Sequence, residues 1–223
     1  MEGRLWAAGT RRDSGRVDRS RVVDIRVPYG TAGDLRTGIL ERVAKVAFVA
    51  HCLLNQNART AGGARCPGVY SPLVDELRAQ GWELAQMPCP ELTFTGLNRF
   101  WAVREQYDTL AFRRHCRRIA EGVAGAVAAH LERGDEVVLV GVDGSPSMGI
   151  RVTSSDPLRG GRPQWPDEAT DLAPGRGILI EELLAALDAR GAPAPRATGV
   201  TYVLPEHDPD TERAAFASFL EAR

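Results

Sequence analysis

The feature that most constrains the fold is a recurring unit, in which a short apolar run is followed at once by a turn of chemically active residues. The clearest case is KVAFVAHCLLNQN, at Lys45–Asn57, where the apolar run Val46–Ala50 leads to Cys52. An apolar run bounded by polar residues predicts a buried strand. Two later turns repeat the unit: MPCPEL at residues 87–92 and GVDGSPSMGI at residues 141–150. Because ligands bind at the carboxyl ends of strands in open α/β sheets, we expect the three turns to converge on one site.

The rest of the chain alternates apolar strands with amphipathic helices. We expect strands at 46–50, 82–87, 136–142 and 197–204, and helices at 71–80, 108–132, 177–190 and 208–222. Between them, residues 93–106 are expected to be irregular, and the Gly-, Pro- and Ser-rich residues 151–174 a long loop. Regular strand–helix alternation predicts a single-domain α/β fold, Rossmann-like, with a mainly parallel sheet.

The N-terminal residues 1–42 lack periodicity and mix Arg with Asp, Gly and Ser, so we expect a poorly ordered extension ahead of an α/β domain at 43–223. The formal net charge of −1 argues against bulk attraction to nucleic acid. No apolar run is long enough to span a membrane and no apolar leader opens the chain, so a cytoplasmic location is expected. Four cysteines are too few for a disulfide scaffold, and suit metal ligands, reactive thiols or core residues.

Four motifs follow one another in a fixed order: HCLLNQNAR, PCPEL, VDGSPSMG and GRGILIEEL. Together they resemble the motif set of the TudS-like (DUF523-related) desulfidase family, and within it the branch whose first motif is HCLLNQN. The resemblance covers roughly Lys45 to Leu204. It implies an iron–sulfur protein in which three cysteines hold a [4Fe-4S] cluster with one iron left open. The implied activity is the removal of sulfur from a small thiocarbonyl compound such as thiouracil.

Carried over by motif, the resemblance assigns two cluster ligands to Cys52 and Cys89, whereas the third ligand position holds Met148. A thiolate is a charged, strong ligand for iron, and a thioether is neutral and weak. Three interpretations therefore stay open. Cys66, in GGARCPG, substitutes as the third ligand; Met148 ligates weakly; or the chain has lost the cluster and kept the fold, as a binding protein for a small molecule or a partner.

If a cluster forms, the resemblance implies that its open iron captures the substrate's sulfur as a Lewis acid. Glu91, two residues after Cys89, is then the expected base that activates water, and Ser145 is expected to position the substrate or pass a proton. The other polar side chains of the same turns are candidates for substrate binding: Asn55, Gln56, Asp143 and Ser147.

Each of these residues also has a purely structural interpretation. Free cysteine is among the most buried residue types, so Cys52 and Cys89 taken singly would be core thiols. Glu91 follows a proline and could simply be an acid in the first turn of a helix. Cys116, inside RRHCRR on an expected helix, is expected to pack or to face the surface. The motifs that flank Cys52 and Cys89 favour a site over these alternatives.

Two geometric expectations follow. The sulfur atoms of Cys52, Cys89 and Met148 should lie on three loops at one end of the sheet and face a shared cavity. Cys66 follows the Cys52 loop closely, so it should lie nearer to that cavity than Cys116 does.

Overall fold

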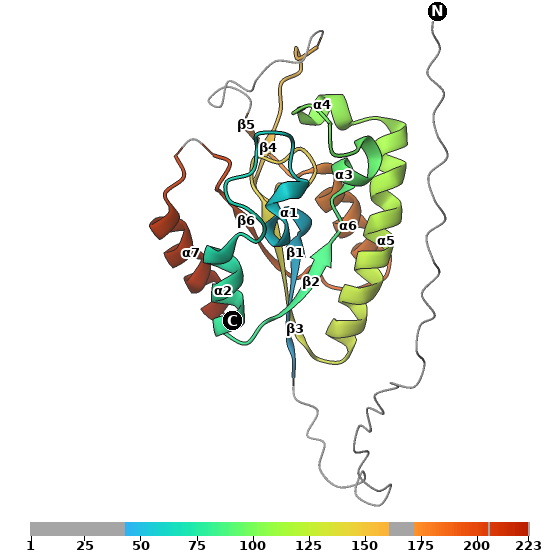
Figure 1. The fold of residues 1–223 in the computed structure, drawn as a ribbon. Coiled ribbons are helices and arrows are strands. Elements are labelled where there is room, and N and C mark those ends of the chain that lie inside the picture. Colours follow the sequence, from blue (N-terminus) through green and yellow to red (C-terminus); the bar gives the residue numbers. More distant parts are fainter. Residues whose placement is uncertain (1–42, 161–171, 205, 223) are drawn as a thin grey trace, which may run out of the picture. The chain divides into compact units, whose positions relative to one another are not determined.

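A four-stranded parallel sheet lies at the centre of the computed structural model (Figure 1), which describes residues 43–160, 172–204 and 206–222. In spatial order its strands are β2 (Glu83–Met87), β1 (Lys45–Ala50), β3 (Glu136–Val142) and β6 (Arg196–Val200). Each neighbouring pair is parallel. The expected α/β class and mainly parallel sheet are confirmed. The expected N-terminal extension, residues 1–42, lies outside the described residues.

The two central strands are buried on both faces, as parallel strands covered by helices must be. Every residue of β1 after Lys45 is buried, and so is every residue of β3 after Glu136. Phe48 pairs with Leu139 across the two strands, and both belong to the main hydrophobic cluster. The continuous apolar runs that predicted these strands therefore form the core of the domain.

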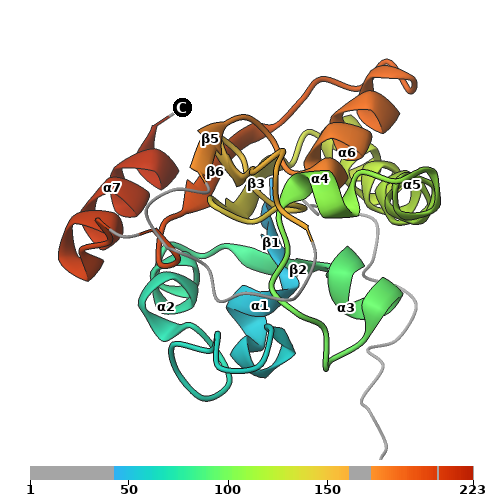
Figure 2. The same ribbon diagram turned by 90° about the horizontal axis from the view of Figure 1, so that it is seen from above.

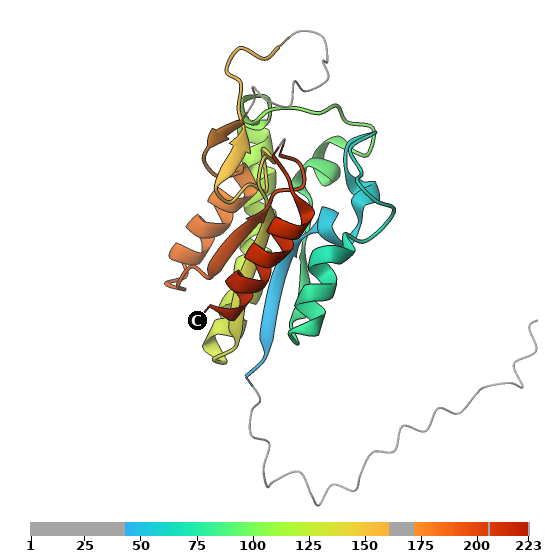
Figure 3. The same ribbon diagram turned by 90° about the vertical axis from the view of Figure 1, so that its left-hand side faces the viewer.

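Helices cover both faces of the sheet, as the view from above shows (Figure 2). One face carries α5 (Leu110–Glu132) and α6 (Ile178–Asp188), which pack against each other. The other face carries α2 (Ser71–Ala79) and α7 (Pro209–Glu221), and Figure 3 shows these two helices from the side. None of the helices in the described ranges is long and apolar enough to cross a membrane.

Local sequence signals set the bounds of these helices. The side chain of Thr109 accepts a hydrogen bond from the Phe112 amide at 3.2 Å and caps α5. Asp208 caps α7 in the same way, by accepting from the Thr211 amide at 3.0 Å. Gly81 ends the segment after α2 with a φ of 79°, a conformation that favours glycine.

The structure also contains short elements that the sequence pattern did not predict. Helix α1 (His51–Leu54) and the 3₁₀ helix η1 (Gln56–Ala58) replace the loop expected after β1. Helices α3 (Pro90–Thr95) and α4 (Arg104–Tyr107) lie partly within the stretch expected to be irregular. The expected long loop forms a small antiparallel pair, β4 (Val152–Ser154) with β5 (Leu172–Pro174). Strand β6 ends at Val200, before the expected end at 204, and residues 202–203 form a turn.

Candidate functional site

The predicted site residues follow the carboxyl ends of adjacent parallel strands. Cys52 comes two residues after β1, and Cys89 two residues after β2. The turn 143–149 follows β3 directly, and Tyr202 comes two residues after β6. Since all four strands run in the same direction, these residues lie along one edge of the sheet. The predicted convergence of the three turns on this edge agrees with the strand order.

The Cys52 thiol lies on α1, and its one hydrogen bond among the described residues comes from Tyr202. The Tyr202 hydroxyl is 3.3 Å from Cys52 Sγ. Desolvation raises the pKa of Cys52, while the Tyr202 hydrogen bond and the charge of Arg59 act in the opposite direction. The Arg59 guanidinium stacks over the Tyr202 ring, 4.9 Å from its centroid. Cys52 is therefore a protonated thiol at neutral pH, held beside an aromatic hydroxyl and a cation.

The Cys89 thiol is the N-cap of α3, and its Sγ accepts a hydrogen bond from the Leu92 amide at 3.4 Å. The pKa of Cys89 is raised to about 12, mainly by desolvation and to a smaller extent by the negative charge of Glu91. The positive charge of Arg99 and the Leu92 hydrogen bond lower it. Burial thus outweighs both, and Cys89, like Cys52, is protonated at neutral pH.

Glu91 is 9% exposed and connects α3 to the turn after β3. Its Oε1 atom accepts hydrogen bonds from the Ser147 hydroxyl at 2.5 Å and from the Ser145 hydroxyl at 3.4 Å. Its Oε2 atom is 3.5 Å from Nε of Arg99. The structural interpretation of Glu91 is met, because it is an acid in the first turn of α3, and its role as a catalytic base stays a prediction.

The turn that carries the two serines is held in place by the start of α6. The Ser147 carbonyl accepts the Leu179 amide at 3.0 Å, and the Pro146 carbonyl accepts the Ile178 amide at 3.0 Å. A Cβ atom on Gly177 would lie 2.2 Å from the carbonyl carbon of Ser147, so only glycine permits this approach. Ser147 itself is fully buried. The helix start therefore fixes the hydroxyl that bonds Glu91.

Two of the four candidates for substrate binding, Gln56 and Asp143, bond to their own chain. Gln56 is buried; its amide donates to the Cys52 carbonyl at 2.7 Å and accepts from the Arg65 amide at 3.1 Å. The Asp143 carboxylate, also buried, accepts the Ile150 amide at 2.9 Å and pairs with Nε of Arg151 at 2.9 Å. These contacts give both residues structural roles, and a substrate contact for either stays a prediction.

The fourth candidate, Asn55, is exposed, and its side chain caps η1 by accepting the Asn57 amide at 3.1 Å. The cap explains why an asparagine stands at the start of η1. That Asn55 contacts a substrate likewise stays a prediction.

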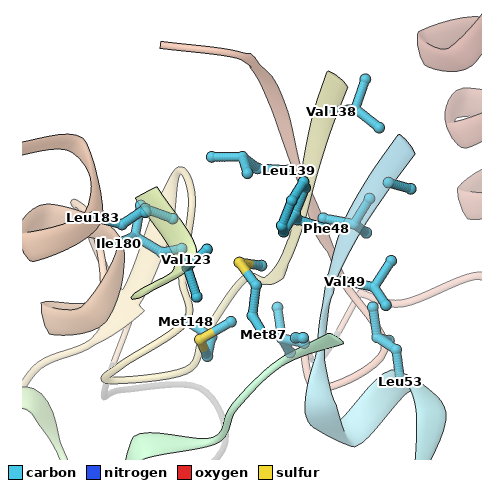
Figure 4. Packing of buried hydrophobic residues seen from close by; sticks show 14 of the residues in the cluster. Phe48, Val49, Leu53, Met87, Val123, Val138, Leu139, Met148, Ile180 and Leu183 are labelled. Atoms are coloured by element: carbon cyan, nitrogen blue, oxygen red, sulfur yellow. The ribbon is translucent and has the colours of Figure 1, made fainter. Parts of the chain in front are cut away.

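The thioether of Met148 is part of the hydrophobic core. Met148 is 3% exposed and belongs to the main cluster of buried apolar residues. Figure 4 shows it among Met87, Val123 and Ile180. Its backbone completes the turn, because the Met148 amide donates to the Ser145 hydroxyl at 3.1 Å and the carbonyl accepts the Val142 amide at 2.9 Å.

The two remaining cysteines have different surroundings. Cys66 is half-buried, and its thiol donates to the Val69 carbonyl at 3.4 Å. Cys116 is fully buried on α5, and burial, with smaller contributions from the negative charges of Glu182 and Glu91, raises its pKa to about 12. Cys116 therefore packs in the core. That Cys66 is the nearer of the two thiols to the site stays a prediction.

The side chains present do not fit a cluster held by three thiolates. Cys52 and Cys89 supply two thiols at one edge of the sheet, and the third position supplies a neutral thioether packed among apolar side chains. Within the described ranges, no group of three or more His, Cys, Asp and Glu side chains is arranged to hold a metal ion.

Two side chains at this site carried no signal in the sequence. Tyr202 bonds Cys52 from 150 residues further along the chain. Arg99 lies in the aromatic stretch expected to be irregular, yet its side chain is only 6% exposed and faces Glu91. Neither belongs to a motif, and a lone Tyr or Arg has no spacing that could reveal its partner.

The fold and the site define an α/β protein with two half-buried thiols and a serine-bound carboxylate at the carboxyl edge of a parallel sheet. A family model described as "Putative 2-thiouracil desulfurase" matches residues 45–162, just over half of the chain. The chain belongs to this family.

Two individual proteins are similar to it. An uncharacterized protein of Methanocaldococcus jannaschii, MJ0003, is 29% identical over 138 residues, which cover 62% of this chain and 74% of that protein. A solved structure described as "[4Fe-4S]-dependent thiouracil desulfidase TudS" is 22% identical, with a TM-score of 0.39, over 70% of this chain and 90% of the other. At that TM-score the structural likeness supports no statement about the site.

Proposed function

We propose that this protein binds a small thiocarbonyl compound of the thiouracil kind beside Cys89 and Glu91, and replaces its sulfur with oxygen. Membership of the 2-thiouracil desulfurase family supports the substrate class. The observation that carries the proposal is the pair of serine hydroxyls bonded to Oε1 of the buried Glu91, since a buried carboxylate with hydroxyl partners can accept a proton.

The proposed reaction is a hydrolysis. A water molecule hydrogen-bonded to Ser145 attacks the thiocarbonyl carbon, and its proton passes through the Ser145 hydroxyl to Oε1 of Glu91. The carbon–sulfur bond then breaks, the second proton of the water passes to the sulfur as the carbonyl forms, and sulfur leaves as hydrosulfide. Glu91 afterwards returns its proton to solvent. No oxidation or reduction is needed, because carbon keeps its oxidation state. Ser147, 2.5 Å from Glu91, keeps the carboxylate in position for the transfer.

The experiment measures hydrosulfide and uracil released from 4-thiouracil by protein prepared without oxygen. We expect Glu91→Gln to lower the rate by about 10²–10⁴-fold, the usual contribution of a positioned acid–base group. Glu121→Gln, on the exposed side of α5, is the matched control and should keep the rate. A Glu91→Gln variant as active as the parent would contradict the role of Glu91.

A second candidate function rests on Met148. With two thiols and a core thioether in place of three thiolates, the protein could bind the thiocarbonyl compound without turning it over. This function predicts saturable binding of 4-thiouracil in equilibrium dialysis with no release of hydrosulfide. The expected cytoplasmic location and the expected absence of a nucleic-acid partner stay predictions.

A further inference from the structure

Arg99 is a buried cation with an N–H group at Nε that has no hydrogen-bond partner in the part of the chain that the structure describes. Its side chain is 6% exposed, in the segment between α3 and α4. One terminal nitrogen donates to the Gly96 carbonyl at 3.2 Å, and the other donates to the Ala58 carbonyl at 3.0 Å. Among the described residues, Nε is buried and has no hydrogen-bond acceptor. A buried donor without an acceptor is costly, so this N–H is suited to a bound molecule.

Glu91 also has an oxygen atom, Oε2, that can accept a further hydrogen bond. Both serine hydroxyls bond its Oε1 atom, whereas no hydrogen bond within the described ranges ends on Oε2. Oε2 and the Arg99 Nε atom are 3.5 Å apart, which is an ion pair without the alignment of a hydrogen bond. The Arg99 Nε–H donor and the Glu91 Oε2 acceptor therefore lie side by side and buried, and each can form one more hydrogen bond.

This pair is complementary to one chemical group. A ring with an N–H next to a C=O or C=S offers a donor and an acceptor side by side, so it can form two parallel hydrogen bonds with a neighbouring acceptor and donor. The ring's own donor and acceptor lie closer together than Oε2 and Nε, which are 3.5 Å apart, so two hydrogen bonds of about 2.7–3.2 Å would spread slightly from the ring toward the protein. Glu91 lies in the first turn of the helix that Cys89 caps, and the charges of Glu91 and Arg99 both act on the pKa of this thiol.

We propose that Arg99 and Glu91 together recognise the N–H/C=X edge of the thiolated ring, where X is oxygen or sulfur. Oε2 of Glu91 accepts the ring N–H, and Nε of Arg99 donates to the neighbouring oxygen or sulfur. This inference rests on the proposed function, since it names the part of the substrate that the site reads. Because the ring contacts only Oε2 of Glu91, the Oε1 atom and the two serines stay available for the proton transfer.

The test compares three ligands on the wild-type protein by isothermal titration calorimetry: 4-thiouracil, its 3-methyl derivative and its 1-methyl derivative. The proposed edge is the N3–H with a neighbouring C=X group. Methylation at N3 removes this edge, whereas methylation at N1 leaves it intact and blocks only the second edge of the ring, N1–H with C2=O, so a preference for the 3-methyl derivative would also overturn the inference. We expect 3-methylation to weaken binding at least tenfold and 1-methylation to weaken it less than threefold. Equal effects of the two methyl groups would overturn the inference and leave the proposed function standing. If 4-thiouracil itself does not bind, both fail.

A protein variant tests whether Arg99 causes the preference for the 1-methyl over the 3-methyl derivative. Arg99→Lys keeps the positive charge and loses the Nε–H, so we expect its preference for 1-methyl over 3-methyl to fall to less than threefold. Arg190→Lys is the matched control, because the Arg190 side chain donates to a single backbone carbonyl, that of Glu121, at 3.1 Å. It should keep the wild-type preference. A wild-type preference in Arg99→Lys would overturn the assignment, and the ligand comparison on the parent protein stands even if this variant does not fold.

Discussion

Replacing Met148 by cysteine tests whether this position is a degraded ligand of a metal cluster. Met148 is 3% exposed within the hydrophobic cluster, so the change removes packed atoms. Methionine has two more heavy atoms than cysteine, and each is worth about 0.8 kcal/mol of burial, as for a CH₂ group. With a term for the space left behind, we expect the free energy of unfolding of the iron-free protein to fall by about 1.5–2.5 kcal/mol.

The same change should increase iron binding, because it adds a third thiolate to Cys52 and Cys89. We expect wild-type protein reconstituted without oxygen to hold well under the iron of one full cluster per chain, and Met148→Cys to hold more. The measurements are iron and acid-labile sulfide per chain, with urea unfolding of the iron-free forms. Met148→Ala is the control: it loses about 2–5 kcal/mol, like other core truncations, and gains no iron.

Two results would refute this reasoning. If Met148→Cys binds no more iron than the parent, position 148 is not a lost ligand. If the parent is already fully loaded, another residue supplies the third ligand, with Cys66 first in line, and the conclusion that the donor set does not fit is wrong.

Two further predictions concern the pKa of Cys89 and the packing at Gly199. With its pKa raised to about 12 against 9.0 for an ordinary thiol, Cys89 should react with iodoacetamide about 1000-fold more slowly at pH 8, and its rate should rise about tenfold per pH unit up to pH 11. Mass spectrometry of the labelled peptide measures this, and a plateau near pH 9 would contradict it. Gly199→Ala should lower the free energy of unfolding by about 1–3 kcal/mol in urea, because the new Cβ would lie 2.1 Å from Oδ1 of Asp143. Gly125→Ala, with only the Arg190 side chain within 4 Å, should instead raise it by about 0.5–1 kcal/mol.

The sequence alone predicts the parallel sheet and the edge of the sheet at which the two thiols lie. Continuous apolar runs identify β1 and β3 because parallel strands are buried on both faces. Once the strands are parallel, the residues that follow them must share an edge, which brings Cys52 and Cys89 to the same place. The start of α3 also had a usable signal, since a proline at its first position and Glu91 in its first turn are typical of a helix start.

Side-chain partners could not be predicted in the same way. Gln56 and Asp143 have the polar character of ligand-binding residues, yet their oxygens accept backbone amides of their own loops. Whether a polar group faces a ligand or its own backbone depends on the path of the loop, which no residue pattern encodes. The Tyr202–Cys52 and Arg99–Glu91 contacts depend on tertiary packing alone.

The hydrogen bond from Tyr202 to Cys52 can form only late in the synthesis of the chain. The two residues are 150 positions apart, and at roughly 5–20 residues per second the ribosome needs about 8–30 s to add that length. Cys52 leaves the ribosome early, while β6 and Tyr202 are still to be synthesised. The Cys52 thiol of a growing chain therefore lacks its hydrogen-bond partner for many seconds, until β6 joins the sheet.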